Sequence, residues 1–220
     1  TNEEVYARLR NGGANYDILF PSDYMVARMI REGMLQKLDF ENIPNFKNIV
    51  PSFHNSNFDP TNEYSVPYMW GTVVVIYNKD MVDEEDIGSW ELLWNQKYMG
   101  DILMFANPRD DFGIALKRLG YPMNPENEEQ LSEALELLKD QKFLVQAYVM
   151  DEIFDKMLGG EAAIAPYYAG DAITMMAENE SLGCFVPEEG TNRFIDAMVI
   201  PTCAKEKECA EMFINFMLEG

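Results

Sequence analysis

Short apolar runs alternate along the chain with segments in which apolar residues recur every three or four positions. The runs predict buried strands, and the wider spacing predicts helices with one apolar face. The predicted strands are residues 16–20, 73–76, 102–105, 142–148, 162–165, 183–186 and 193–200. The predicted helices are residues 1–10, 24–33, 89–94, 112–119, 131–138, 153–158, 172–177 and 210–218. Strands that alternate with helices predict an α/β fold with largely parallel sheets.

Polar and aromatic side chains recur at the turns where predicted strands end. In an open α/β sheet, ligands bind just beyond the carboxyl ends of the strands. Four such turns carry Ser22, Asp23 and Tyr24; Asn107 to Asp111; Tyr168 with Asp171; and Phe194 with Asp196. An aromatic face contacts the methylenes and part of the charge of an amine, and a carboxylate binds its ammonium group. Together, these residues predict a cage for an organic cation.

Two of these residues also have a purely structural interpretation. Ser22 and Asp171 each precede a predicted helix, and Ser and Asp are favoured N-cap residues. Capping is the commoner role for such a serine, whereas for Asp171 the two roles are evenly balanced. Tyr168 is expected to contact a ligand through its ring and not through its hydroxyl, because a ring face attracts a cation without the phenol oxygen.

The charge of the chain narrows the choice of partners. The 220 residues include 38 acidic and 17 basic side chains, a formal net charge of -21. This charge argues against nucleic acid or an anionic membrane as a partner, and it would attract a cationic ligand. No stretch approaches the ~20 apolar residues of a membrane span, and no signal peptide opens the chain. Because the chain begins and ends in helical patterns, flanking parts are expected to be missing.

Metal and nucleophile chemistry have little support in the sequence. A single histidine, His54, lies in a polar loop, so neither a zinc site nor a Ser-His-Asp or Cys-His arrangement is predicted, and no cofactor is expected. Cys203 and Cys209 are six positions apart and are candidates for a disulfide, whereas Cys184 lies in an apolar run and is expected to be buried.

Six segments resemble the spermidine/putrescine-binding proteins of polyamine ABC transporters, in the same order as in that family. They are YDILFPSDYMVARMIREGMLQKLD, YSVPYMWGT, SWELLW, ALKRLGY, YYAGDA and FIDAMVIP. The resemblance implies an extracytoplasmic binding protein, periplasmic or lipid-anchored at the outer face of the cell membrane. It also implies an importer with permease and ATPase subunits as partner, and no catalysis.

The family's architecture implies two α/β lobes joined by a hinge, in an incomplete chain. The first lobe would comprise residues 1–72 and 195–220 and the second residues 73–194, with crossings near 71–74 and 193–196. Positions that match the family's ligand-binding residues are Ser22, Tyr24, Asn107, Asp110, Tyr168, Asp171, Phe194 and Asp196. Asn107 stands where a carboxylate is common, and Tyr168 and Phe194 replace tryptophans, which have the best ring face for a cation.

Two alternatives remain open at this point. The same architecture binds other small solutes, such as thiamine or an amino acid derivative. In a different class, a hydrolase would use paired carboxylates as acid and base, either Asp110 with Asp111 or Asp171 with Asp196.

Overall fold

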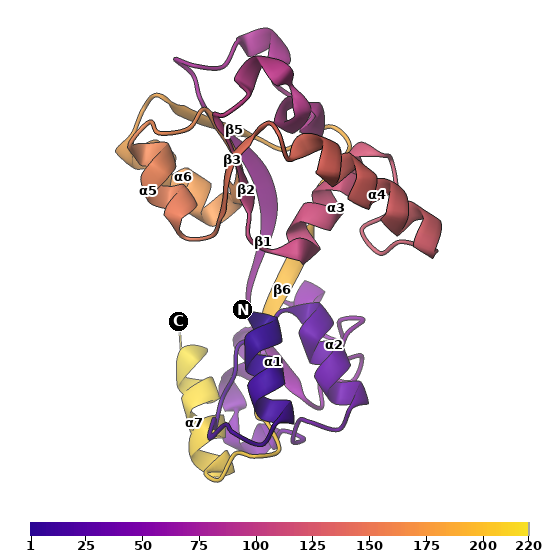
Figure 1. The fold of residues 1–220 in the computed structure, drawn as a ribbon. Helices are drawn as coiled ribbons and strands as arrows, with labels where there is room; N and C mark the ends of the chain where they lie inside the picture. The colour runs from indigo at the N-terminus through magenta and orange to yellow at the C-terminus, as the bar shows by residue number, and fades with distance from the viewer. Residues whose placement is uncertain (220) are drawn as a thin grey trace. The chain divides into compact units, whose positions relative to one another are not determined.

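The computed structural model describes residues 1–219; Gly220, which the predicted first lobe includes, lies outside the described residues. The chain forms two compact units, Thr1–Trp70 with Phe194–Gly220 and Gly71–Arg193. It passes between them twice, within strand β1 (Ser65–Asn78) and at the start of strand β6 (Arg193–Val199), which pairs with β1 (Figure 1). That the two units are the lobes of a hinged protein stays a prediction.

A mixed sheet forms the centre of the unit Gly71–Arg193. Its strand order is β3 (Val145–Val149), β2 (Ile102–Phe105), β4 (Ile164–Tyr168), β1 and β5 (Leu182–Phe185). β2 runs parallel to β3 and β4, whereas β1 runs antiparallel to β4 and β5. The predicted α/β class is confirmed, but the prediction of a largely parallel sheet is wrong at β1. Strands β2 to β5 are linked by helices and run in one direction, and β1 needs no such crossover because it enters from the other unit.

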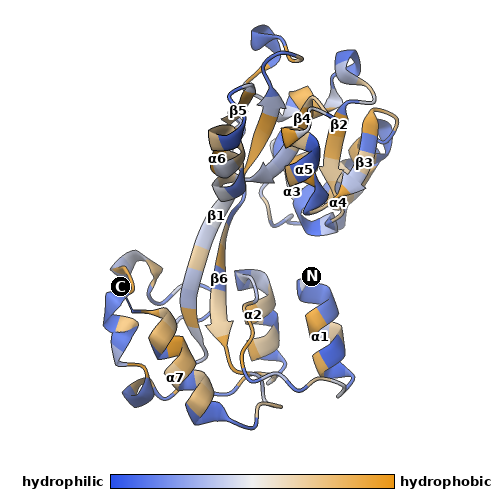
Figure 2. Cartoon of the chain, turned by 90° about the vertical axis from the view of Figure 1, so that its left-hand side faces the viewer, coloured by the Kyte–Doolittle hydropathy of each residue, from blue (hydrophilic) through white to orange (hydrophobic). Residues whose placement is uncertain are grey.

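Helices cover both faces of this sheet. Figure 1 shows α3 (Pro108–Arg118) and α4 (Glu128–Gln141) on one side and α5 (Glu152–Leu158) and α6 (Ala169–Glu178) on the other. All four residues of β2 are fully buried, as expected for a strand covered on both faces. In Figure 2 the hydrophobic colour is accordingly concentrated on the strands, and the helices alternate between hydrophobic and hydrophilic segments.

The other unit packs its helices against the two sides of β6. Helices α1 (Asn2–Arg10) and α2 (Asp23–Arg31) form one apolar cluster, which includes Ala197 and Val199. Helix α7 (Lys207–Met217) forms another, which includes Met198. Successive residues of a strand point to opposite faces, so β6 separates the two clusters. No helix among residues 1–219 is long and apolar enough to cross a membrane.

Three further predicted elements differ from the structure. Residues 16–20 form no regular strand, because only Leu19 makes a bridge there, to Val199, and Pro21 has no N–H to extend the ladder. β1 is much longer than the predicted strand 73–76, because it begins at Ser65 and continues through Gly71. The predicted helix at residues 89–94 is a 3-10 helix, Trp90–Trp94, and other short 3-10 helices lie at Phe40–Asn42, Pro44–Asn48, Pro51–Phe53, Glu84–Asp86 and Gln96–Tyr98.

Candidate functional site

Asp110, in the first turn of α3, is the centre of a hydrogen-bond cluster in the unit Gly71–Arg193. Its Oδ2 accepts hydrogen bonds from Asn107 Nδ2 at 2.6 Å and from the Tyr168 hydroxyl at 3.1 Å. Its Oδ1 accepts one from Asn192 Nδ2 at 3.3 Å. The side chain is only 7% exposed. Three donors around one buried carboxyl group fix its orientation and suit its charged form.

Local sequence explains how these groups meet. Asn107 is the N-cap of α3, where its Oδ1 accepts from the backbone N–H of Arg109 at 3.1 Å and leaves the amide nitrogen free to reach Asp110. Tyr168 is the last residue of β4, which lies beside β2 in the sheet. Because β2 and β4 are parallel, their carboxyl ends lie at the same edge.

Tyr168 makes contacts both through its hydroxyl group, which donates to Asp110, and through its ring. The ring lies 5.2 Å from that of Phe105 and 5.6 Å from that of Tyr167. Burial, and then the neighbouring charge of Asp110, raise the pKa of the Tyr168 phenol. The hydroxyl therefore stays protonated and donates a hydrogen bond to Asp110. The hydroxyl thus orients Asp110, and that Tyr168 contacts a ligand through its ring stays a prediction.

Asp171 does not join this cluster. It is exposed, at the third position of α6, and the N-cap of that helix is Tyr168. Desolvation and then the charge of Asp151 raise the pKa of Asp171. Burial, and then the charge of Asp171, raise the pKa of the Tyr167 phenol to about 12. Asp171 therefore acts on Tyr167, whereas Asp110 accepts a hydrogen bond from Tyr168. The predicted capping role of Asp171 is also wrong.

The other unit contains a second carboxyl–hydroxyl pair. Ser22 Oγ donates to Asp196 Oδ1 at 2.6 Å, where the backbones of the two residues form an antiparallel bridge. Ser22 is the N-cap of α2 but makes no side-chain capping bond, and Asn2 Nδ2 donates to its Oγ at 3.1 Å. Burial raises the pKa of Asp196, the Ser22 bond lowers it, and the charge of Asp23 raises it.

The remaining predicted residues of this unit flank that pair. Asp23 Oδ1 accepts from the backbone N–H of Tyr24 at 2.6 Å, and the Tyr24 hydroxyl donates to Glu3 Oε1 at 2.7 Å. Phe194 is half-buried on β6, two residues before Asp196. The predicted residues thus form two half-sites: Asn107, Asp110 and Tyr168 in one unit, and Ser22, Asp23, Tyr24, Phe194 and Asp196 in the other. That they bind a ligand stays a prediction.

Comparison with known proteins identifies the family. The model of a family described as bacterial extracellular solute-binding protein matches residues 14–220. The chain belongs to this family. A spermidine/putrescine-binding periplasmic protein of Salmonella typhimurium is 37% identical over 220 residues. That match covers 99% of this chain and 63% of the relative, so the chain spans less than two thirds of the relative's length.

Solved structures agree with this assignment. A putative spermidine/putrescine ABC transporter protein from Listeria monocytogenes has 38% sequence identity and a TM-score of 0.93. The spermidine/putrescine ABC transporter substrate-binding protein PotD from Streptococcus pneumoniae has 39% identity and a TM-score of 0.80. Each match covers 100% of this chain and 68% of the other. The predicted family and the predicted fold class are therefore confirmed.

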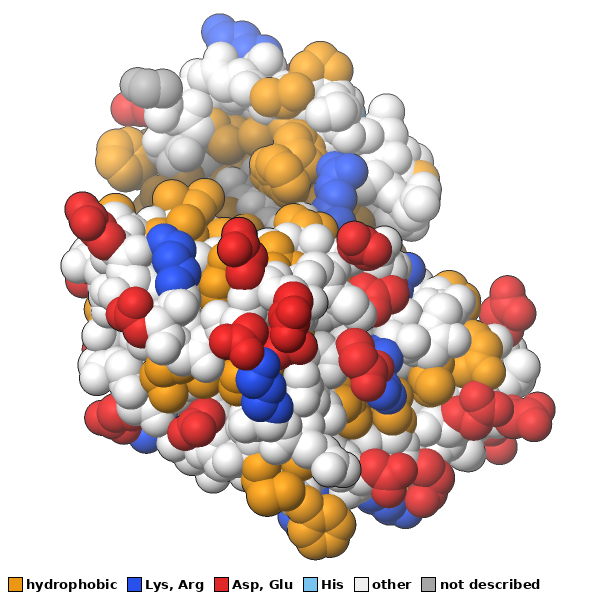
Figure 3. Space-filling view, turned by 90° about the horizontal axis from the view of Figure 1, so that it is seen from above, with side chains coloured by type: hydrophobic (Ala, Val, Ile, Leu, Met, Phe, Trp, Pro, Cys, Tyr) orange, Lys and Arg blue, Asp and Glu red, His pale blue; other side chains and the backbone are white. Residues whose placement is uncertain are grey.

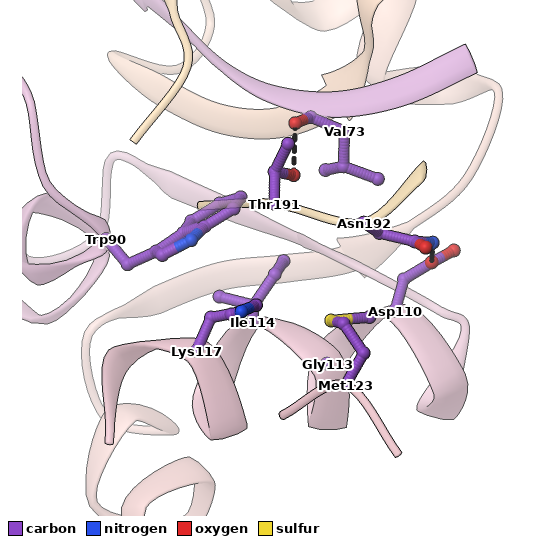
Figure 4. Close-up of a pocket in the computed structure, with 9 residues that line it drawn as sticks. All are labelled: Val73, Trp90, Asp110, Gly113, Ile114, Lys117, Met123, Thr191 and Asn192. Carbon is purple, nitrogen blue, oxygen red and sulfur yellow. Dashed lines mark hydrogen bonds between the residues drawn. The ribbon is translucent and has the colours of Figure 1, made fainter. Parts of the chain in front are cut away.

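In this solute-binding protein, a small cavity lies beneath the Asp110–Asn192 pair. Its volume is about 10 Å³, room for about one water molecule. Figure 4 shows Asn192 pointing toward Asp110, and Thr191 Oγ1 donating to the Val73 carbonyl oxygen at 2.5 Å. The other lining residues are Trp90, Gly113, Ile114, Lys117 and Met123. The segment just before β6 is thus joined by side chains to both β1 and the Asp110 cluster.

The sequence did not indicate Asn192 or the burial of Asp111. Asn192 lies in a loop, and a polar loop residue gives no signal of its long-range partner. Asp111 is 8% exposed, and desolvation, followed by the charge of Asp110, raises its pKa to about 8. Its place in the first turn of a helix, where aspartate is common, conceals this burial in the sequence.

The remaining features to compare with the sequence are the cysteines, metal ligands and surface charges of the described residues. Cys203 and Cys209, the candidates for a disulfide, are exposed free thiols, and Cys184 is half-buried, less than expected. Among residues 1–219, no group of three or more His, Cys, Asp or Glu side chains is arranged to hold a metal ion. Figure 3 shows acidic side chains distributed over one face, with a few lysines and arginines between them.

Proposed function

We propose that the protein binds a polyamine, putrescine or spermidine, through carboxylates and rings of the two half-sites. The observation that carries this proposal is the Asp110 cluster. A nearly buried carboxyl group is oriented by Asn107, Tyr168 and Asn192 and lies beside aromatic rings at the carboxyl edge of the sheet. A carboxylate that is held in place with a ring at its side binds an ammonium group and the methylenes next to it.

The second half-site supports the same chemistry. Asp196 accepts a hydrogen bond from Ser22, and the half-buried aromatic residues Tyr24 and Phe194 each lie two positions along the chain from one member of this pair. Putrescine has two amines and spermidine three, so a ligand of this class needs more than one anionic group. The relatives that are named for spermidine and putrescine have 37% and 38% identity to this chain, which supports the same ligand class here.

The proposal extends to location and partners. The protein would act outside the cytoplasm and deliver its ligand to the permease and ATPase subunits of an ABC importer, without catalysing a reaction. Its relatives are substrate-binding components of such transporters. Asp171 is proposed as an accessory anion, because it lies on the first turn of α6, one turn beyond Tyr168.

Calorimetric titration with putrescine, spermidine and thiamine tests the proposal. We expect saturable binding of at least one polyamine and none of thiamine. If thiamine binds and no polyamine does, the alternative function is favoured, in which the same architecture binds another small solute. No heat with any of the three, on protein that melts cooperatively, would contradict the proposed function.

A further inference from the structure

Asp111 is a buried carboxyl group without the contacts that such a group normally has. It is 8% exposed, and its Oδ1 is fully buried with no hydrogen-bond partner among the described residues. Neighbouring Asp110 has three donors, whereas Asp111 shares none of them. A buried polar atom without a partner costs about 1–3 kcal/mol, and a buried charge without a partner costs more. An unsatisfied group beside a candidate site therefore needs an explanation.

Among residues 1–219, the groups that shift the pKa of the Asp111 carboxyl group include no cation. The groups that act on it are the carboxyl group of Asp110 on α3 and the backbone of Phe105 on β2, and Asp111 in turn acts on the Tyr148 phenol of β3. None of these groups is cationic. Two neighbouring carboxyl groups at one buried edge favour a state in which one of them keeps a proton. Since Asp110 has the donors, Asp111 is the one that keeps it.

Asp111 lies where a ligand would change this balance. The carboxyl ends of β3, β2 and β4 meet at this edge, and β3 brings Tyr148, whose ring is 42% exposed. An ammonium group bound at Asp110 would bring a positive charge close to Asp111. A nearby positive charge favours the ionised form of a carboxyl group.

We propose that Asp111 is a further ligand-recognition residue, which is neutral in the ligand-free protein and releases its proton when an ammonium group binds beside Asp110. This inference depends on the proposed function. The only covalent change is loss of the Asp111 carboxyl proton to the solvent, and the ligand keeps its own protons. Binding of a cation thereby creates a second anion at the same half-site. The protein avoids a buried pair of negative charges when no ligand is bound.

Calorimetry in two buffers with different ionisation enthalpies measures the protons released on binding. Putrescine and spermidine would be titrated at pH 7.0 into the full chain and into Asp111→Asn, with Asp140→Asn as a control. Asp140 is exposed on α4, so its variant makes the same carboxyl-to-amide change at a solvated position on another helix. We expect the parent and Asp140→Asn to release close to one proton per ligand, and Asp111→Asn to release markedly less.

The outcomes separate this inference from the proposed function. If neither polyamine binds, the proposed function fails. If a polyamine binds and the parent releases no proton, or Asp111→Asn releases as many as the parent, the inference is wrong although the function stands. Carbon NMR of the Asp111 carboxyl group in the parent protein covers the case in which the variant fails to fold. A carboxyl signal that shows the same ionisation state with and without polyamine at pH 7.0 would also overturn the inference.

Discussion

Each half-site contains a hydrogen bond from a hydroxyl group to a carboxyl group. Tyr168 donates to Asp110 and Ser22 donates to Asp196, and each bond joins residues that are far apart in the sequence. A carboxylate that has lost one of its donors keeps its charge but is less firmly oriented toward a ligand. Small changes at these positions should therefore alter binding more than folding.

Replacing Tyr168 by phenylalanine tests this idea. The change keeps the ring and removes one donor to Asp110, so we expect polyamine affinity to fall by roughly 1–3 kcal/mol, the range for a hydrogen bond to a charged group. Tyr168→Leu should lose more, because the ring is also removed. Titration calorimetry on both variants measures these losses.

Tyr121→Phe is the matched control. Its hydroxyl donates to Glu133 at 2.7 Å on an exposed surface, so the same atom is removed from the same kind of bond elsewhere. We expect unchanged affinity in this variant. Equal affinity in Tyr168→Phe and the parent would show that the hydroxyl has no part in ligand binding.

Asp111 should make the folding stability depend on pH. Its pKa is about 8 in the folded protein against about 4 in an unfolded chain, so the folded state holds a proton that the unfolded state has lost. The titration of Asp111 therefore lowers the free energy of unfolding progressively as pH rises from about 4 to about 8. Asparagine at position 111 does not titrate. We therefore expect the free energy of unfolding of Asp111→Asn, relative to that of the parent, to increase by about 2–5 kcal/mol between pH 5 and pH 8.5.

Chemical denaturation at the two pH values measures this difference. Asp140→Asn should show no comparable change, since Asp140 is exposed. An advantage of Asp111→Asn that is the same at both pH values would contradict the raised pKa.

Residue positions in the candidate site could be predicted only in part. The strand-end rule places Asn107, Asp110 and Tyr168 at one edge of the sheet, where the structure brings them together, whereas Phe194 and Asp196 lie within β6. The partners of those residues could not be predicted. Asn192 meets Asp110 across 82 residues of sequence, and such a contact depends on the fold of a loop that has no periodic pattern.

At the scale of elements, the sequence pattern was most informative where burial is complete. The four residues of β2 form one apolar run and are fully buried in the structure. The direction of β1 could not be predicted, since an apolar run is the same in a parallel and an antiparallel strand. Residues 16–20 resemble a strand in composition, but Pro21 limits their pairing to single bridges.

The pairing of β1 with β5 depends on a glycine. Gly183 lies opposite Tyr77, and a Cβ at position 183 would lie 2.7 Å from the Tyr77 ring. Gly183→Ala should therefore destabilise the protein by roughly 1–3 kcal/mol, the usual cost of overpacking. Thermal or denaturant melts measure the change.

A double variant and a control make this test specific. Tyr77→Leu removes the ring, so Gly183→Ala should cost much less when it is combined with Tyr77→Leu. Gly13→Ala should be close to neutral, because a Cβ there meets no atom within 4 Å. If the cost of Gly183→Ala is the same with leucine at position 77, the ring is not the cause.

At the scale of the whole molecule, the net charge of -21 should assist the capture of a cation. Salt screens this long-range attraction over a Debye length of about 8 Å at physiological ionic strength. Polyamine affinity should therefore fall modestly between 20 mM and 500 mM sodium chloride, mainly through a slower association rate. Stopped-flow and equilibrium titrations measure the two quantities. Affinity that is flat across this range would point to an uncharged ligand.

The most direct test compares Asp110→Asn and Asp196→Asn in titrations with putrescine and spermidine, with Asp140→Asn as the charge control. Each carboxylate belongs to a different unit and is proposed to bind the same class of ligand. Asparagine keeps the size of the side chain but removes the charge, so each variant should lose about 1.5–3 kcal/mol of binding and melt close to the parent. Unchanged affinity in both variants, with Asp140→Asn also unchanged, would show that neither carboxylate binds the polyamine.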